Sequence, residues 1–211
     1  MLIYITNGSE KVFGIGLSRT GTRSLNQALE HLGYRAFHWR FSSENRLVAL
    51  GDAYFCDAIT DINAAFQFEI LDRTFPAAKF VYTTRPLESW VPAVSAHYDA
   101  ASPDILLQQL RAIAVEQDPT KPIAIVHTPL YHAIHHTLYT GHRSWRDAYE
   151  AHESRVRSHF EGRPEKLLTL GIVAEGGGWP ELCAFLGKPV PSMSFPRIDW
   201  HTQSVSANVT A

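Results

Sequence analysis

Cysteine, an excess of positive charge and long apolar runs are scarce or missing in this sequence. Its two cysteines, Cys56 and Cys183, are too few for a disulfide framework, and no other sequence feature indicates an oxidising compartment. Lysine and arginine number 19 against 21 aspartates and glutamates, a net charge of −2 that argues against nucleic-acid binding and membrane-surface binding. No stretch approaches the roughly 20 apolar residues of a membrane span, and residues 1–9 lack the pattern of a signal peptide. We therefore expect a soluble, cytoplasmic protein whose partners include neither nucleic acid nor membrane.

What the sequence does contain is enough apolar material for a core. Hydrophobic residues make up 45% of the chain and aromatic residues 11%, which excludes a disordered or fibrous protein. A length of 211 residues suits one domain, and no internal repeat or linker interrupts it. We therefore expect residues 1–211 to form a single domain.

The first forty residues have the pattern of a strand, a glycine-rich loop, a helix and a second strand. A strand-like run at 11–15 precedes the loop, apolar residues then recur at helical spacing as far as Gly33, and a second run follows at 34–39. An earlier run at 2–5 is separated from 11–15 by a turn signal, which would join the two as a hairpin. Two strands connected through a helix indicate a parallel sheet.

The alternation of strands and helices continues along the chain. Further strands are predicted at 79–84 and 166–172. Helices are predicted at about 64–75, from Pro86 as a first helical residue, after Ser102 and Ser144, and from Trp179. The sequence therefore predicts an α/β protein of three layers (α/β/α) with a mainly parallel central sheet.

The glycine-rich loop is the main candidate for a functional site. Residues 16–21 read Gly-Leu-Ser-Arg-Thr-Gly, the glycine spacing of a nucleotide-binding P-loop, and unpaired N–H groups and the helix dipole converge at such a turn. P-loops continue with lysine and then serine or threonine, whereas Thr22 and Arg23 follow here. The best strand ends in Thr84-Arg85, so an aspartate to help hold Mg²⁺ is missing as well.

The side chains of this loop favour a terminal phosphate or sulfate held without metal. Hydroxyl and guanidinium groups suit such an anion. The candidate binding residues in the loop and the following turn are Ser18, Arg19, Thr20, Gly21, Thr22, Arg23 and Ser24. The alternative is an ordinary turn between a strand and a helix that happens to be polar.

These residues resemble the sulfotransferases that use 3′-phosphoadenosine 5′-phosphosulfate (PAPS). The stretch 18–22 is similar to their 5′-phosphosulfate loop, with arginine replacing the commoner lysine, and the strand ending at Arg85, followed by Ser89 on a helix, is similar to their 3′-phosphate site. The similarity is closest to a bacterial-type subfamily, whose further motifs stand in order at 61–65, 71–76 and 179–191. The resemblance spans about 12–196.

The resemblance implies a P-loop NTPase-like sulfotransferase fold. The reaction would move a sulfuryl group from PAPS, with no metal, to a hydroxyl or amine of a small acceptor molecule. Arg85 and Ser89 would hold the 3′-phosphate, although the family serine usually stands where this chain has Ala93, which leaves Ser89 and Ser95 as alternatives. Arg197, and with it His201, is the available late basic segment.

The candidate catalytic residues are Arg19, Asp61 and His38. Arg19 would stabilise the charge that develops on the leaving phosphate, because a guanidinium stays charged at any working pH. The acceptor hydroxyl must lose a proton, and the position at which animal cytosolic members place a histidine corresponds here to Asp61. His38, at the end of its strand, is the alternative base. In the alternative interpretation, Asp61 only caps the helix that follows it, and His38 has a structural and not a catalytic role.

Three further expectations concern specificity and competing functions. Residues 98–144 are the least family-like and are predicted to form a helical lid over the acceptor site. His132, His135 and His136 lie close in sequence, but no third ligand of fixed geometry stands out, so no metal site is predicted.

The alternative functions are a P-loop kinase that uses ATP–Mg²⁺ and a non-catalytic nucleotide-binding module. The protein could also form a homodimer.

Overall fold

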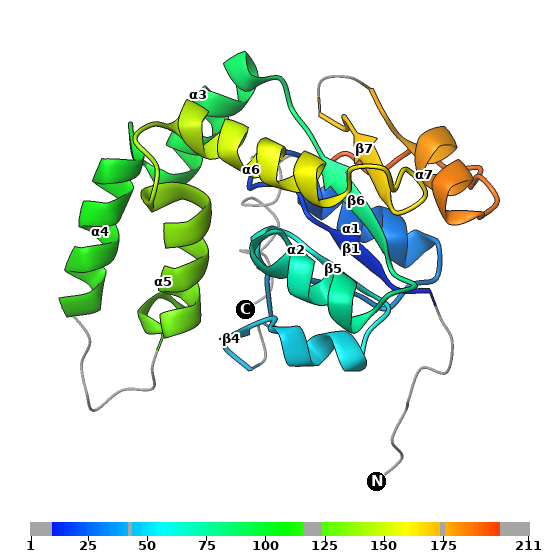
Figure 1. Cartoon of the computed structure of the whole chain (residues 1–211), viewed down its shortest axis with the longest axis horizontal. Coiled ribbons are helices and arrows are strands. Elements are labelled where there is room, and N and C mark those ends of the chain that lie inside the picture. The colour runs from blue at the N-terminus through cyan, green and yellow to red at the C-terminus, as the bar shows by residue number, and fades with distance from the viewer. Residues whose placement is uncertain (1–9, 42–43, 116–123, 174–175, 199–211) are drawn as a thin grey trace, which may run out of the picture.

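The computed structural model describes residues 10–41, 44–115, 124–173 and 176–198, and its centre is a five-stranded sheet (Figure 1). The strands are β1 (Val12–Gly14), β2 (Ala36–His38), β5 (Ala58–Thr60), β6 (Lys79–Thr83) and β7 (Leu167–Leu170). They lie in the order β2-β5-β1-β6-β7, and every neighbouring pair is parallel. The predicted parallel sheet is confirmed. Two short strands, β3 (Arg40–Phe41) and β4 (Arg46–Leu47), pair separately.

Helices connect the strands and cover both faces of the sheet. The α-helices are α1 (Thr22–His31), α2 (Ile62–Thr74), α3 (Leu87–Tyr98), α4 (Pro103–Val115), α5 (Pro129–His135), α6 (Trp145–His159) and α7 (Trp179–Leu186). Two short 3₁₀ helices, η1 (Leu50–Tyr54) and η2 (Ile125–His127), and a π-helical turn, η3 (His136–Thr140), complete the described elements. None of the helices in these ranges has both the length and the apolar character that crossing a membrane requires.

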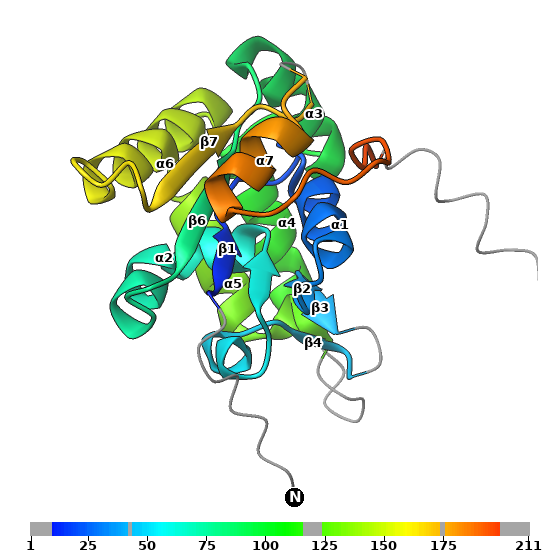
Figure 2. The same cartoon turned by 90° about the vertical axis from the view of Figure 1, so that its right-hand side faces the viewer.

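Successive residues of the strands face opposite helical layers, as the pleat of a strand requires. Phe13, Phe80 and Tyr82 pack in a buried cluster with residues of α2 and α6. Val12 and Val81 pack on the other face with residues of α1 and α7. Figure 2 shows α2 and α6 to one side of β1 and β6, with α1 on the other. The predicted three-layer α/β architecture is therefore confirmed.

A third buried cluster lies among the helices beyond the sheet. Trp90 of α3, Tyr139 of η3 and Trp145 of α6 are nearly or fully buried in it, together with residues of α4 and α5. Figure 1 shows α4 and α5 set to one side of the sheet. Much of the described part of 98–144 is thus helical, while its role as a lid stays a prediction.

The structure refines several predicted boundaries. The strand predicted at 34–39 is the shorter β2, and β5 lies between it and β1. Pro86 is the N-cap of α3 rather than its first helical residue, with ψ of 134°. The predicted cap at Ser144 is confirmed, because its side chain accepts a hydrogen bond from the Asp147 N–H at 3.0 Å. The run at 2–5, and therefore the predicted hairpin, lies outside the described residues.

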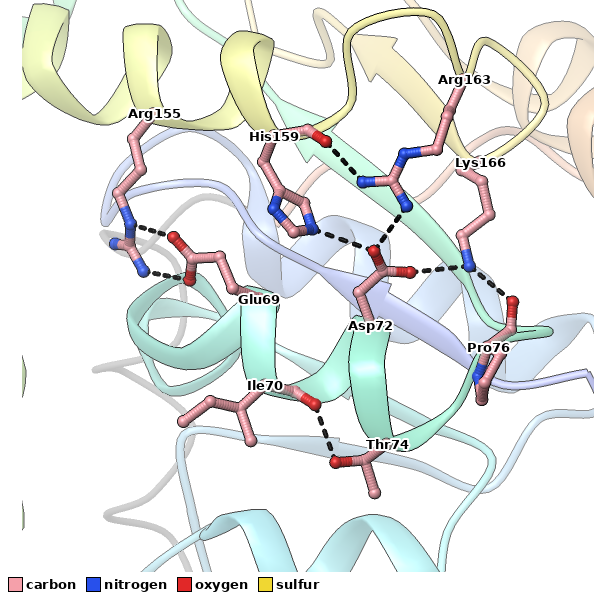
Figure 3. Close-up of polar contacts among 9 residues, drawn as sticks. All are labelled: Glu69, Ile70, Asp72, Thr74, Pro76, Arg155, His159, Arg163 and Lys166. Carbon is pink, nitrogen blue, oxygen red and sulfur yellow. Dashed lines mark hydrogen bonds and ion pairs between the residues drawn. The ribbon is translucent and has the colours of Figure 1, made fainter.

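A buried carboxylate joins α2 to the segment between α6 and β7 (Figure 3). Asp72, whose side chain is 8% exposed, accepts hydrogen bonds from Arg163 and Lys166 at 2.7 Å and pairs with His159 at 2.9 Å. Burial by itself would raise the pKa of Asp72, but the hydrogen bonds from Lys166, Arg163 and His159 outweigh it and hold the pKa at about 2. One carboxylate therefore ties three side chains of α6 and the following segment to α2.

We predict that Asp72→Asn lowers the free energy of unfolding by about 2 kcal/mol at pH 7. The pKa is lower in the folded chain than in the unfolded one, so the contribution is complete above about pH 4 and is lost as the pH falls toward 2. Urea unfolding of both proteins at pH 7 and pH 3 measures this, and the gap between them should narrow at pH 3. Glu150→Gln, which removes an exposed ion pair with Arg146, is the control and should change little. An equal gap at both pH values would contradict the prediction.

Candidate functional site

A cavity of about 710 Å³ opens at the carboxyl edge of the parallel sheet. Parallel α/β sheets bind ligands at this edge, because the loops that leave the strand ends converge there. Residues of the loop after β1, the ends of β2 and β5, helix α3 and the C-terminal segment share the lining. The lining residues are Ser18, Arg19, Gly21, Thr22, Arg23, Ser24, His38, Asp61, Arg85, Ala93, Ala96, His97, Ile172, Val173, Arg197 and Ile198.

Ten of the twelve sequence-predicted residues line this cavity, and Thr20 and Ser89 do not. Thr20 is buried within the loop, where its hydroxyl donates to the Leu17 carbonyl and lies 2.7 Å from the Thr83 hydroxyl. The Thr20 N–H also bonds to the Leu17 carbonyl. Thr20 therefore shapes the loop, and its hydroxyl is not offered to the cavity as the sequence had suggested.

The cavity is strongly cationic although the whole chain is slightly acidic. Four arginines line it, Arg19, Arg23, Arg85 and Arg197, against a single carboxylate, Asp61. Burial, and then the charge of Arg19, lower the pKa of Arg85, so the positive charges of the two arginines act on each other. Such an arrangement is stabilised by a bound anion.

Two glycines let the loop turn closely around the cavity. A Cβ on Gly16 would lie 1.9 Å from the Thr83 hydroxyl and 2.7 Å from the Thr83 carbonyl oxygen, so no side chain fits there. Gly21 has φ of +100° and is the N-cap of α1. The first N–H groups of α1 have no partners within the helix, and the turn at Gly21 directs them toward the cavity.

Side chains from the outer helices hold the loop in place. The Trp90 indole donates to the Ser18 carbonyl at 2.8 Å, and the Ser18 N–H donates to the Tyr139 hydroxyl at 2.9 Å. The Ser18 hydroxyl lies 3.0 Å from the Tyr98 hydroxyl. These three aromatic residues come from α3 and η3, so the helices beyond the sheet are bonded directly to the anion loop. Sequence reasoning missed this contact, because no local pattern links residues so far apart.

The C-terminal segment closes one side of the cavity. The Ile198 N–H donates to the Ser24 hydroxyl at 3.0 Å, which joins this segment to the first turn of α1. The Arg197 guanidinium donates to the carbonyl groups of Ile172 and Gly176. Arg197 thus reaches the cavity as predicted, whereas His201 lies outside the described residues.

Of Arg85 and the two candidate serines, Ser89 and Ser95, only Arg85 lines the cavity. Arg85 lines the cavity, and its Nε donates to the Ser89 hydroxyl at 3.1 Å. Ser89 therefore stands beside Arg85, outside the cavity lining. Ser95 bonds to the Ala100 carbonyl at 2.8 Å and does not line the cavity either. Of the two alternatives, only Ser89 contacts Arg85.

Asp61 and His38, predicted as alternative bases, lie next to each other. His38 Nε2 is 3.5 Å from Asp61 Oδ2, and the Thr22 hydroxyl donates to Asp61 Oδ1 at 3.2 Å. Asp61 has φ of 86°, a strained value for a residue other than glycine. Its side chain makes no capping hydrogen bond to α2, so the interpretation of Asp61 as a simple helix cap is wrong. Burial lowers the pKa of His38, although the charge of Asp61 acts in the opposite direction. The lowered pKa keeps the imidazole neutral near pH 7.

His97 is a lining residue that sequence reasoning missed. Burial lowers its pKa first, followed by the charges of Arg19 and Arg23, while Asp61 opposes them. Its imidazole therefore lies within electrostatic reach of both ends of the cavity. The spacing held a signal, since His97 stands four residues after Ala93 and so lies on the same side of α3.

No group of three or more potential metal ligands comes together in the described ranges, and this includes the histidines of α5 and η3. His135 is buried instead, with its Nδ1 at 2.8 Å from the Tyr131 carbonyl oxygen and its ring stacked on Tyr131. His135 therefore belongs to the packing of the outer helices, whereas His136 is exposed.

Comparisons with known proteins agree with this geometry. A family model described as a sulfotransferase domain matches residues 11–203, most of the chain. The chain is also similar to the Ava biosynthesis cluster protein M of Aspergillus versicolor, with 26% identity over 222 residues that cover 89% of this chain and 80% of that protein. The glycine-rich turn, the cationic cavity and the length of the match lead to one conclusion: the chain belongs to the sulfotransferase domain family.

Proposed function

We propose that this protein transfers a sulfuryl group from PAPS to a hydroxyl or amine of a small acceptor, without a metal. The observation that supports this most is the cationic cavity at the start of α1, where four arginines converge. PAPS supplies the sulfuryl group when bound. Its two phosphorylated ends call for two separate cationic contacts, and the cavity offers Arg19 and Arg85 on different elements.

The residues present fit such a donor. Among the described residues, the Arg19 Nε is buried without a hydrogen-bond partner, and a buried donor of this kind calls for an acceptor such as a phosphate or sulfate oxygen. Arg19 also has φ of 71°, a strained value that is retained at functional sites. The loop N–H groups and Arg19 would hold the 5′ end, and Arg85 with Ser89 the 3′-phosphate.

The acceptor would lie near His38 and Asp61. Both line the same cavity as Arg19, which is the geometry that a transfer between two bound molecules needs. A neutral imidazole beside a carboxylate can take up the proton that an acceptor hydroxyl loses. The described helices of the region 98–144, α4, α5 and η3, would then close over the acceptor.

Nucleotide recognition separates this proposal from a P-loop kinase. Adenosine 3′,5′-bisphosphate should raise the melting temperature of the protein, because a ligand that binds only the folded state stabilises it. ATP with Mg²⁺ should raise it much less, since the lysine of the kinase loop is replaced by Thr22. A larger shift with ATP–Mg²⁺ would favour the kinase, and no shift with either would reject both.

We predict that Arg19→Ala lowers kcat about 100-fold or more and weakens nucleotide binding much less. A contact that strengthens as charge develops stabilises the transition state more than the bound substrate. Turnover with radiolabelled PAPS and calorimetric titration with adenosine 3′,5′-bisphosphate measure the two effects. Arg146→Ala, which removes an exposed arginine on α6, is the matched control. Equal losses in turnover and affinity would make Arg19 a plain binding residue.

We predict that Arg85→Ala weakens binding of adenosine 3′,5′-bisphosphate about 10- to 100-fold, as expected for the loss of charged hydrogen bonds. Binding of adenosine 5′-phosphate, which lacks the 3′-phosphate, should change less than about threefold. Titration calorimetry of both nucleotides measures this, with Arg111→Ala on the exposed side of α4 as the control. A uniform loss for both nucleotides would remove the 3′-phosphate role from Arg85.

A further inference from the structure

A chain of side-chain hydrogen bonds runs inward from His38, away from the cavity. His38 Nδ1 lies 2.8 Å from the Thr60 hydroxyl, which donates to the Asn26 side-chain oxygen at 3.0 Å. The Asn26 amide nitrogen donates to a Glu30 carboxylate oxygen at 2.8 Å. Thr60 and Asn26 are 0% and 8% exposed, whereas Glu30 is at the surface of α1. The chain thus joins the cavity to the outside through two buried polar residues.

The chemistry of its outer end fixes the direction of every bond in this chain. An ionised carboxylate can only accept hydrogen bonds, so Glu30 requires the amide nitrogen of Asn26 to face it. The Asn26 oxygen must then face Thr60, and the single hydroxyl proton of Thr60 is used on that oxygen. The Thr60 oxygen is left as an acceptor, so His38 Nδ1 has to be the donor.

A neutral imidazole carries one proton, and here that proton is on Nδ1. Nε2 is therefore left with its lone pair, and this lone pair faces the cavity and Asp61 Oδ2 at 3.5 Å. Two acceptor atoms facing each other at that distance have no proton between them. The group that satisfies both is a ligand with a proton to give.

We propose that Asn26 and Thr60 are positioning residues that fix His38 as the Nδ1-protonated tautomer, so that Nε2 is the atom that takes the proton of the acceptor hydroxyl or amine. This assignment rests on the proposed sulfuryl transfer. The acceptor O–H or N–H bond breaks, its proton forms a bond to Nε2, and the electron pair stays on the acceptor atom, which becomes the nucleophile. The Asp61 carboxylate then lies beside an imidazolium and stabilises it. His38 is thereby chosen over Asp61 as the base.

The tautomer can be read directly by NMR of the ligand-free full chain. In uniformly ¹⁵N-labelled protein, the two ring nitrogens of His38 have different shifts when protonated and when not, and His38→Gln identifies the signal among the 11 histidines. The wild-type protein should show Nδ1–H. Thr60→Val removes the hydroxyl at nearly constant volume, and Asn26→Leu frees the Thr60 proton to point back at His38. Both variants should move the proton to Nε2, where Asp61 can accept it.

Thr60→Ser is the conservative control, since it keeps a hydroxyl at the same place and should retain Nδ1–H. Circular dichroism and melting temperature show which variants are folded, and Thr60→Val and Asn26→Leu test the same chain independently. A wild-type signal with Nε2–H, or an unchanged tautomer in both variants, would overturn the assignment.

Turnover provides the second readout. Radiolabelled PAPS is supplied with simple alcohols, phenols and amines, benzyl alcohol and 2-naphthol among them. Thr60→Val and Asn26→Leu should lower kcat about 10- to 100-fold with little change in the KM for PAPS. Thr60→Ser, which keeps the hydroxyl, should have most of the wild-type kcat. A changed tautomer with unchanged kcat would overturn the role of His38 as base. The expected tautomers with no transfer by the wild-type protein would count against the proposed function and leave the hydrogen-bond chain intact.

Discussion

The candidate site depends on how one residue of the anion loop, Ser18, is held on both sides. Ser18 has its carbonyl bonded by the Trp90 indole and its N–H bonded by the Tyr139 hydroxyl, both in the buried interior. A buried loop without such partners would leave polar backbone groups unsatisfied, at a cost of about 1–3 kcal/mol each. With both peptide groups of Ser18 bonded, the chain takes the strained turn at Arg19 and starts α1 at the edge of the cavity. The outer helices therefore support the anion loop directly, because Trp90 and Tyr139 satisfy its buried backbone groups.

The polar groups of the cavity fall into two sets with opposite electrostatic character. The arginines form a positive region that extends over the anion loop, the start of α1, the end of β6 and the C-terminal segment. His38 and Asp61 form the other set, at the ends of β2 and β5, where an imidazole and a carboxylate lie side by side. A carboxylate placed among the arginines would neutralise part of their positive charge. The position of Asp61 beside His38 is therefore consistent with both the proposed anion binding and the proposed proton uptake.

Local sequence patterns predict most of the fold and part of the site. The alternation of strands and helices, the glycine spacing at 16–21 and the polar residues at strand ends are local signals, and a parallel sheet brings such ends to one edge. The roles of Thr20, Tyr139 and Asn26 could not be read in this way. Each depends on which atom of a distant residue faces it, as Thr20 faces Thr83 across the loop. Hydrogen-bond direction is set by three-dimensional contacts, and the composition of a loop says little about it.

The position of Asp61 shows why its two sequence interpretations had to be separated by geometry. An aspartate before a helix is usually a cap, and capping would direct its carboxylate back at the first N–H groups of α2. A left-handed backbone at Asp61 turns the side chain away from those groups and toward Thr22 and His38. The strain of that conformation is retained although a relaxed cap was available at the same residue. The Asp61 carboxylate therefore lines the cavity instead of capping α2, and α2 packs against the sheet through its buried apolar residues.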